Sequence, residues 1–322
     1  MYAGGSMDLD VLKSMVAVAE TGSFSKAGTR LCVSQSAVSK RIRLLEDTLG
    51  MQLLDRSGQQ LALTAAGKVV EKSARAMLEI CSRCTMELAA LRGAVKIDFR
   101  CTPSFGISTM PAVTRLLMEQ NPELVTVSIA NLSSIVDALL DSRCQLAVVE
   151  YCDLNPLSHD FRQEPLQGDS LVFVGAPALG IQSAGVGFDD LLTQPLFIRS
   201  SGCCSRQVLE SRLEDGGCRL QSFANVLICD DLNMIVRSLL AGCGIGYLVR
   251  GVVADQIESG LLREYDLPQF RQTIKRSLLY GPSFVETRES LDLVNIIRSL
   301  VGSPLGLTQG AVSTRLFQAV PF

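Results

Sequence analysis

The sequence of 322 residues has one histidine, no long apolar run and a small net charge, and each shortage excludes a class of protein. The single histidine, His159, excludes most Ser–His and Cys–His nucleophile pairs and histidine-rich metal sites. No stretch approaches the roughly 18 to 20 uninterrupted apolar residues that a membrane-spanning helix needs. The first residues also lack a basic segment followed by an apolar core. We therefore expect a cytoplasmic protein without a membrane partner.

Nucleotide-binding signatures are missing as well. The cluster of Gly242, Gly244 and Gly246 imitates part of a dinucleotide-binding fingerprint, but it precedes a predicted strand instead of following one. No glycine-rich loop ends in the lysine that binds nucleotide phosphates. We therefore expect neither an enzyme nor a bound cofactor.

The net charge of −3 argues against a protein that coats nucleic acid through bulk electrostatics. Up to Arg92 there are 12 Lys and Arg against 9 Asp and Glu, whereas the remainder has 18 against 24. Any DNA contact should therefore lie in the amino-terminal third. Because the basic excess is modest, useful affinity would need two linked copies of the chain.

Residues 22 to 56 have the pattern of a compact helix-turn-helix. Four apolar residues fall four, three and four apart on one helical stripe: Val38, Ile42, Leu45 and Leu49. The opposite stripe carries Ser36, Ser39, Lys40 and Arg43. Short hydroxyls allow a helix to approach base edges, and Lys and Arg reach guanine or phosphate. With Ser34 as N-cap, residues 35–49 are a candidate recognition helix, although an ordinary amphipathic helix would show the same pattern.

The order of residues from Met7 to Gly67 resembles the amino-terminal domain of LysR-type transcriptional regulators. The residues that carry this resemblance include Leu9, Leu12, Val16, Gly22, Ser23, Phe24, Ser25, Ala27, Leu31, Ser34, Gln35, Ala37, Val38, Ser39, Ile42, Leu45, Glu46, Leu49, Gly50, Leu53, Arg56, Leu63, Thr64, Ala66 and Gly67. It implies a winged helix-turn-helix over residues 7–66 that binds double-stranded promoter DNA. The expected DNA contacts are Ser34, Gln35, Ser36, Ser39, Lys40, Arg43, Arg56 and Thr64.

The chain departs from this family at several positions. Gly28, Ser36 and Leu54 stand where the family usually has Ala, Pro and Phe. The stretch 57–60 also lacks the arginines that family wings often carry. We expect the fold to be kept and the affinity for DNA phosphates to be lower.

A long helix should follow the DNA-binding domain, since residues 68–91 contain no proline or glycine. Apolar residues repeat there at alternating spacings of four and three, at Val70, Ala74, Met77, Cys81, Cys84, Leu88 and Leu91. This heptad seam, with Thr64 as cap and Gly93 at its end, predicts a linker helix over residues 67–93 that pairs with another helix. The family resemblance implies an antiparallel homodimer, or a homotetramer, on a dyad-symmetric operator.

The pair Cys81-x-x-Cys84 suggests metal or redox chemistry as an alternative to packing. Both cysteines lie on the seam, however, and one pair supplies only half of a tetrahedral zinc site unless the dimer supplies the other two ligands. We interpret them as small buried seam residues and expect no metal.

After Ala94 predicted strands alternate with predicted helices, which indicates an α/β architecture. The expected strands are 95–99, 125–129, 146–149, 170–174, 196–199, 241–248 and 276–281, and the expected helices are 108–120, 133–141, 203–215 and 286–301. The last strand and helix should return to the first unit. This pattern resembles the two-lobed, periplasmic-binding-protein-like effector domain of the same family.

The predicted fold is thus α+β and multidomain, with a winged helix-turn-helix, a long linker helix and a two-lobed effector domain over residues 94–302. Lobe I would comprise about 94–166 and 267–302, and lobe II about 167–266. Residues 303–322 lie beyond the resemblance, as a tail of unassigned role.

In that family a small-molecule effector sits between the lobes, and the regulator acts on RNA polymerase at the promoter. The corresponding effector-binding residues are Thr102, Pro103, Ser104, Asn131, Leu132, Arg199, Ser200, Ser201, Gly202, Cys203, Cys204, Gly244 and Gly246. Hydroxyls and backbone N–H groups at a helix start hold anions, and glycines leave room for close approach. Plain capping and turn chemistry is the alternative for each. A small polar or anionic metabolite is the expected effector.

Eleven cysteines without an export signal suggest thiols. Five are expected to be small core residues: Cys32, Cys101, Cys144, Cys229 and Cys243. Cys204 differs, because it follows Gly202 at a predicted helix start near Arg206, where positive potential would lower its pKa. Peroxide-sensing members of the family place a reactive cysteine similarly, and Cys218 would resolve it. A redox-sensing regulator is therefore one alternative, and a solute-binding protein with a degenerate DNA head is another.

Overall fold

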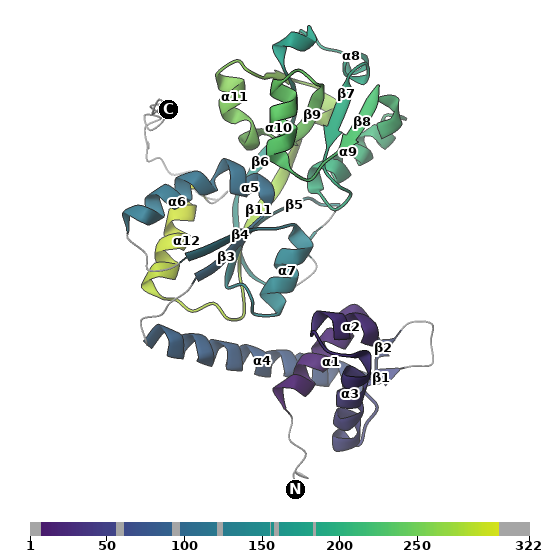
Figure 1. The fold of residues 1–322 in the computed structure, drawn as a ribbon, viewed down its shortest axis with the longest axis vertical. Helices are drawn as coiled ribbons and strands as arrows, with labels where there is room; N and C mark the ends of the chain where they lie inside the picture. Colours follow the sequence, from purple (N-terminus) through teal and green to yellow (C-terminus); the bar gives the residue numbers. More distant parts are fainter. Residues whose placement is uncertain are drawn as a thin grey trace. The chain divides into compact units, whose positions relative to one another are not determined.

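The computed structural model describes residues 8–55, 61–91, 97–120, 125–154, 156–157, 161–182 and 185–302 (Figure 1). Contacts divide the chain into two compact units, Met1–Ala94 and Val95–Phe322. Arg56, the predicted wing residues 57–60, His159 and the tail 303–322 lie outside the described residues. In the part of the chain that is described, no helix has the length and apolar character to cross a membrane.

The amino-terminal unit contains four helices and a short antiparallel ribbon. The helices are α1 (Leu9–Thr21), α2 (Phe24–Arg30), α3 (Gln35–Leu49) and α4 (Ala65–Leu91), and β1 (Leu54–Asp55) pairs with β2 (Ala62–Leu63). The caps explain these bounds: Ser34 Oγ accepts a hydrogen bond from the Ala37 N–H at the start of α3, and Gly50 ends the helix in the left-handed conformation. The predicted recognition helix is therefore confirmed as a helix with the predicted bounds.

The predicted apolar stripe of α3 forms the core of this unit. Val38, Ile42 and Leu45 are buried against Met15 of α1, and Leu49 is half-buried at the edge of the same cluster. The start of α4 packs so tightly that a Cβ on Gly67 would lie 2.0 Å from the Leu53 carbonyl oxygen. These contacts fix the helix-turn-helix on the first turn of α4.

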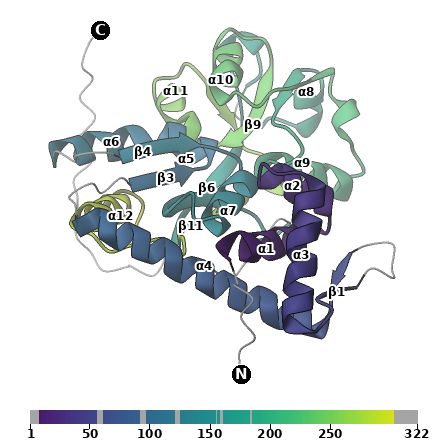
Figure 2. The same ribbon diagram turned by 60° about the horizontal axis from the view of Figure 1, so that its bottom comes forward.

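The 27-residue α4 is one uninterrupted helix (Figure 2). Its seam divides into two parts. Ala74 is buried and Val70 packs against the helix-turn-helix core. The next four seam residues, Met77, Cys81, Cys84 and Leu88, are exposed. The burial of Cys81 and Cys84 was expected in the seam between two paired helices, so it stays a prediction.

The second unit is built on one continuous sheet, whose nine described strands follow the order β4-β3-β5-β11-β6-β9-β7-β8, with β10 also paired to β6. The strands are β3 (Ile97–Cys101), β4 (Val125–Ile129), β5 (Leu146–Tyr151), β6 (Arg162–Gly175), β7 (Pro195–Ile198), β8 (Asn225–Ile228), β9 (Ile245–Val249), β10 (Arg263–Tyr265) and β11 (Gln272–Tyr280). The helices are α5 (Pro103–Ser108), α6 (Met110–Glu119), α7 (Leu132–Leu140), α8 (Phe188–Leu192), α9 (Cys204–Asp215), α10 (Leu232–Leu240), α11 (Ala254–Glu258) and α12 (Arg288–Val301). Four short 3₁₀ turns join them, η1 (Pro177–Leu179), η2 (Leu220–Ser222), η3 (Arg250–Val252) and η4 (Pro268–Phe270).

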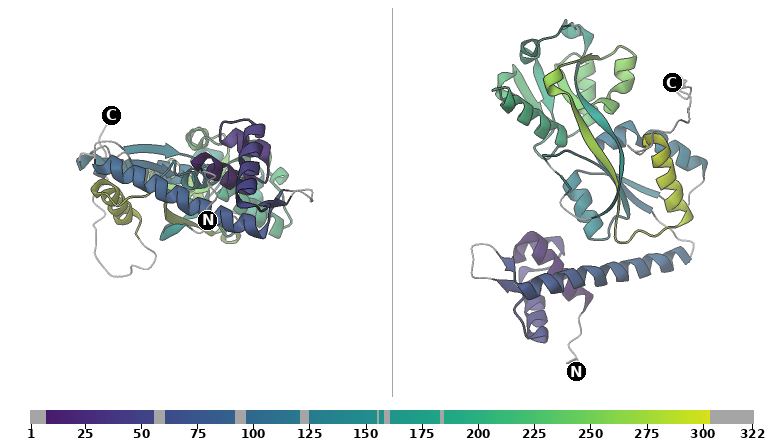
Figure 3. Two further views of the ribbon diagram at one scale, coloured as in Figure 1. Left: turned by 90° about the horizontal axis from the view of Figure 1, so that it is seen from below. Right: turned by 180° about the vertical axis from the view of Figure 1, so that it is seen from behind.

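The strand order creates two lobes that share one ribbon. Lobe I contains the parallel strands β3, β4 and β5 with α5, α6, α7 and α12, and lobe II contains the parallel strands β7, β8 and β9 with α8 to α11. The antiparallel strands β6 and β11 run through both lobes (Figure 3). Because β11 pairs with β5 and α12 packs on α6, the prediction that the last strand and helix return to the first unit is confirmed.

Several predicted elements differ in extent. The helix expected over 108–120 starts at Pro103 and is broken at Thr109, because Pro111 is favoured in the first turn of a new helix. The strand expected over 170–174 is the end of the 14-residue β6. The strand expected over 95–99 is described over Ile97–Cys101, and residues 95 and 96 lie outside the described residues. No element was expected at β8, β10 or α10, which the structure adds to lobe II.

The burial of the five cysteines that were predicted to lie in the core depends on the local backbone. Cys101 and Cys144 are buried, as predicted, and Cys229 is half-buried. Cys32 and Cys243 are exposed, so their assignment to the core is wrong. Both lie in turns that follow a helix, and Cys32 has a positive φ of 54°. Apolar neighbours in the sequence do not bury a residue at such a turn.

Candidate functional site

The outer face of α3 forms a shallow surface hollow that gathers most of the predicted DNA contacts. It is lined by Gln35, Ser36, Ser39, Lys40, Arg43, Leu44 and Asp47. Five of these were expected from the sequence. Leu44, which is 54% exposed, and Asp47 were missed, although both follow Lys40 and Arg43 at helical spacing. The face thus combines hydroxyl, amide, cationic and apolar groups, which are the groups that read base edges and hold phosphates.

The remaining predicted DNA contacts have structural roles or are not described. Ser34 caps α3 and its Oγ lies 2.9 Å from the Ser36 Oγ. Thr64 Oγ1 accepts a hydrogen bond from the Gly67 N–H at 3.0 Å and donates one to the Gln52 carbonyl at 2.8 Å. Thr64 therefore caps α4, as its position predicts. Arg56 lies outside the described residues.

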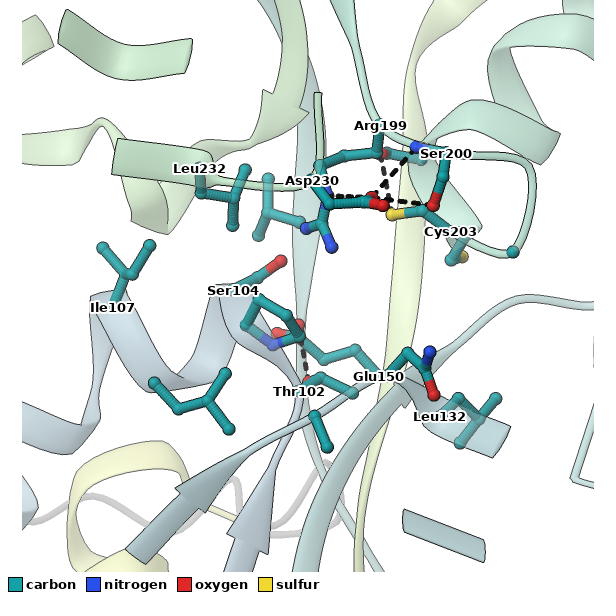
Figure 4. A pocket seen from close by; sticks show the side chains of 18 of the residues that line it. Thr102, Ser104, Ile107, Leu132, Glu150, Arg199, Ser200, Cys203, Asp230 and Leu232 are labelled. Atoms are coloured by element: carbon teal, nitrogen blue, oxygen red, sulfur yellow. Dashed lines mark hydrogen bonds and ion pairs between the residues drawn. The ribbon is translucent and has the colours of Figure 1, made fainter. Parts of the chain in front are cut away.

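A cavity of about 540 Å³ opens between the two lobes of the second unit (Figure 4). Its lining residues are Thr102, Pro103, Ser104, Ile107, Ile129, Ala130, Asn131, Leu132, Ser133, Glu150, Arg199, Ser200, Gly202, Cys203, Cys204, Ser205, Asp230, Asp231, Leu232, Asn233, Leu248, Val249 and Ile274. Ten of the thirteen predicted effector-binding residues are among them. The strand ends and helix starts predicted from the sequence therefore do meet at one place.

The lobe I wall carries a buried acid. Glu150 Oε2 accepts a hydrogen bond from the Thr102 Oγ1 at 3.1 Å, and Oε1 accepts two from Arg276, with Nη2 at 2.7 Å and Nε at 3.2 Å. Arg276 also donates to the Gln167 carbonyl at 3.2 Å and lies 3.6 Å from Asp169. Because Arg276 lies on β11 and its further partners Gln167 and Asp169 lie on β6, the network joins the cavity wall to the shared ribbon.

The lobe II wall carries a cation. Arg199 is 7% exposed, and its Nε donates to Asp230 Oδ1 at 3.3 Å. The Ser200 N–H and Oγ donate to the same oxygen at 3.1 and 2.7 Å. These hydrogen bonds lower the pKa of Asp230, and the bond from the Ser200 hydroxyl has the largest effect. The guanidinium of Arg199 points toward the lobe I wall (Figure 4).

Four helices of the second unit start at the cavity. Asn131 caps α7 and Asp231 caps α10, each accepting backbone N–H hydrogen bonds. Among the described side chains, none caps the N-terminus of α5 or α9, and the Thr102 hydroxyl at the start of α5 donates to Glu150. Two helix starts without a side-chain cap, one from each lobe, therefore border one cavity, and the backbone N–H groups of helix starts attract anions.

The expectation of an acidic Cys204 thiol is wrong. Two effects raise the pKa of Cys204: the larger is a hydrogen bond with Cys152, and the second is burial of the thiol. The positive start of α9 does not compensate for these effects. Cys218 lies beyond the other end of α9, a 12-residue helix about 18 Å long, so the two thiols cannot meet while α9 is intact.

Three predicted effector-binding residues do not line the cavity. Ser201 lies in an exposed turn before α9. A Cβ on Gly244 would lie 2.3 Å from the Pro195 carbonyl oxygen, and one on Gly246 would lie 2.8 Å from the Leu239 Cδ1. The two glycines thus allow close approach to the Pro195 backbone and to the Leu239 side chain, which are parts of the protein itself.

Sequence reasoning missed Glu150, Asp230 and Asp231, which carry the negative charge of the cavity. Glu150 is a single acid inside an apolar strand, and Asp230–Asp231 sit between a strand and a helix start. Those positions are the signals that could have found them. Within the described ranges, no three His, Cys, Asp or Glu side chains of the chain gather as a metal site.

Comparison with known proteins gives consistent matches to both units. Residues 9–68 match the family described as bacterial regulatory helix-turn-helix protein, lysR family, and residues 91–300 match the LysR substrate binding domain. The uncharacterized HTH-type transcriptional regulator YeiE of Escherichia coli K12 is 29% identical over 269 residues, which cover 82% of this chain and 89% of that protein.

Solved structures show the same fold. ArgP from Mycobacterium tuberculosis matches with a TM-score of 0.56 and 19% identity, over 92% of this chain and 97% of that one. Full-length OxyR from Pseudomonas aeruginosa matches with a TM-score of 0.55 and 17% identity, over 95% of this chain and 100% of that one. Both likenesses extend over the amino-terminal and the carboxyl-terminal unit.

Proposed function

Because this chain belongs to the LysR family of DNA-binding transcriptional regulators, which are not enzymes, we propose that α3 reads its operator and that a small anionic effector in the lobe cavity controls it. The observation that carries the effector proposal is the pair of uncapped helix N-termini, α5 and α9, that border the cavity from opposite lobes. Arg199, whose Nε pairs with Asp230, adds further guanidinium donors beside α9.

A carboxylate or similar anion fits this arrangement better than a cation does. The backbone N–H groups of α5 and α9 and the Arg199 guanidinium are all donors. An anion that bridges them would hold the lobes together, and this closed arrangement would differ in affinity from the open one. Effector control needs only such a difference, typically about 1 to 3 kcal/mol.

We propose that the state of the cavity reaches the shared ribbon through Glu150. Its carboxylate contacts Thr102 at the start of α5 on one side and Arg276 of β11 on the other. A shift of α5 on effector binding would therefore change the position of a buried ion pair in the strands that both lobes share.

We further propose that the working unit is a homodimer or a dimer of dimers. The exposed apolar residues of α4, including Met77 and Leu88, form a face that a second α4 would cover. Two linked heads would then read a dyad-symmetric site, and the assembly would act on RNA polymerase at the promoter.

Sequencing of genomic DNA that is recovered with the full-length protein tests the DNA assignment. We expect enrichment of a dyad-symmetric site that is lost in Ser39→Ala/Arg43→Ala, while sedimentation shows the same oligomer. Arg288→Ala, which removes a strongly exposed arginine of the second unit, is the matched control and should retain enrichment. Equal enrichment by the double variant would remove α3 as the reading helix.

A thermal-shift screen of small carboxylates and other anions tests the effector assignment. A ligand at about 100 times its Kd stabilises the folded protein by about 2.7 kcal/mol. We expect an anion that raises Tm in the wild type and in Arg288→Met but not in Arg199→Met. Stabilisation only by cations, or retained binding in Arg199→Met, would refute the anion class.

A further inference from the structure

The linker helix α4 presents two thiols on the part of its seam that the chain itself leaves open. Cys81 and Cys84 are both exposed. Residues three apart on a helix lie on one face with Cβ atoms about 5 to 6 Å apart. One chain therefore offers a pair of neighbouring sulfur ligands but not a complete site.

The spacing of the exposed seam is symmetric about these cysteines. Met77 lies four residues before Cys81, and Leu88 lies four residues after Cys84. Two copies of this seam can pair antiparallel so that each of its four exposed residues faces an exposed residue of the other copy. Met77 then meets Leu88 of the partner. The midpoint of the paired segment then falls between Cys81 and Cys84, so Cys81 of each chain faces Cys84 of the other.

Neighbouring registers of the same seam fit the structure less well. If Cys81 faced Met77 of the partner, Cys84 would face Ala74, which is only 1% exposed in its own unit. If Cys84 faced Leu88, Met77 would extend past the end of the partner's helix. The register that pairs the four exposed seam residues only with one another is the one that brings four thiols together at the dyad.

We propose that Cys81 and Cys84 of two subunits form a four-thiolate site for a zinc-like ion at the dyad of the linker helices. This proposal rests on the homodimer proposed above, and it replaces the expectation of no metal because the matched register supplies the two missing sulfur ligands. Tetrahedral coordination by four cysteine sulfurs at about 2.3 Å is a common structural zinc arrangement. Binding replaces four S–H bonds by four metal–sulfur bonds and releases four protons to solvent, with no change of oxidation state.

Such an ion would fasten the two heads at one separation. Each subunit supplies two ligands, so the site exists only in the dimer and its occupancy depends on dimerisation. By the same linkage, the metal should tighten the dimer. The expected stoichiometry is one metal ion for two chains.

The test uses full-length protein reduced with a phosphine and loaded with Zn²⁺ or Co²⁺ alone. We expect native mass spectrometry to show one metal ion per dimer, Co²⁺ to give thiolate charge-transfer absorption, and the metal to lower the dimer dissociation constant at least about tenfold. Cys81→Ser/Cys84→Ser should lose all three effects. Cys32→Ser/Cys243→Ser, which removes two exposed thiols outside α4, should keep them.

The failures are distinguishable. A metal-free dimer in every condition overturns the site and leaves the proposed homodimer standing. A monomer at micromolar concentration with and without metal overturns the homodimer itself. One metal ion per chain, or a disulfide-linked dimer that binds no metal after reduction, also overturns the shared site.

Discussion

The ion pair between Arg276 and Glu150 gives a quantitative test of the cavity wall. Both side chains are about 5% exposed or less, so Arg276→Met leaves a buried carboxylate whose described partner is Thr102. Breaking a buried pair by removing one partner costs about 3 to 5 kcal/mol. For a unit of this size a loss of about 1 kcal/mol lowers Tm by about 2 to 4 °C. The Tm of the second unit should therefore fall by roughly 6 to 20 °C.

Differential scanning calorimetry of the full chain measures this loss, and a double variant identifies its cause. Glu150→Gln/Arg276→Met removes both charges and should recover much of the stability, because no unpaired charge remains. Arg271→Met breaks an exposed pair with Asp266 and should cost little stability, because solvent screens such a pair. If Arg276→Met is as mild as Arg271→Met, or if the double variant loses as much as the two single variants together, the reasoning fails.

Three further predictions concern pH, thiol reactivity and packing. The hydrogen bond from Arg298 lowers the pKa of Glu164, so its stabilisation is full above the unfolded pKa of about 4.3 and is lost as pH falls through the lower folded pKa. Glu164→Gln should therefore flatten the acid limb of urea midpoints measured between about pH 5 and pH 2, and an unchanged limb would count against the bond. Burial raises the pKa of Cys101 and Cys144 to about 12, so iodoacetamide should modify them at least about 100-fold more slowly than Cys32 at about pH 8, by mass spectrometry, and equal rates would contradict this. Gly67→Ala should destabilise the amino-terminal unit by about 1 to 3 kcal/mol, because its Cβ would meet the Leu53 carbonyl, and an unaltered urea midpoint would show that the contact relaxes.

Local features of the fold could be predicted from the sequence. The bounds of α3 follow from a serine cap, a 3.6-residue apolar period and a closing glycine, all within 17 residues. The return of β11 to lobe I was expected from the order of predicted strands and helices. The extent of β6 was not expected, because its first half is mostly exposed and is a strand only through pairing with β11.

The candidate site shows the same division. Thr102, Ser104 and Arg199 could be expected at the cavity because they follow predicted strands. Glu150 was missed: its place as a single acid in an apolar strand is a signal, but its partner Arg276 lies 126 residues further along the chain, so the pairing could not be predicted. The thiol of Cys204 was expected to be acidic from its helix position, yet its pKa depends on Cys152 from another element.

The strand order has a consequence for biosynthesis. Glu150 of β5 and Arg276 of β11 are direct cross-strand partners, separated by 126 residues of chain that build most of lobe II. At synthesis rates of about 5 to 20 residues per second, the ribosome needs roughly 6 to 25 s between the two strands. During that interval one edge of the nascent β5 awaits its partner and is a target for chaperones, and lobe I closes only when nearly the whole chain has been made.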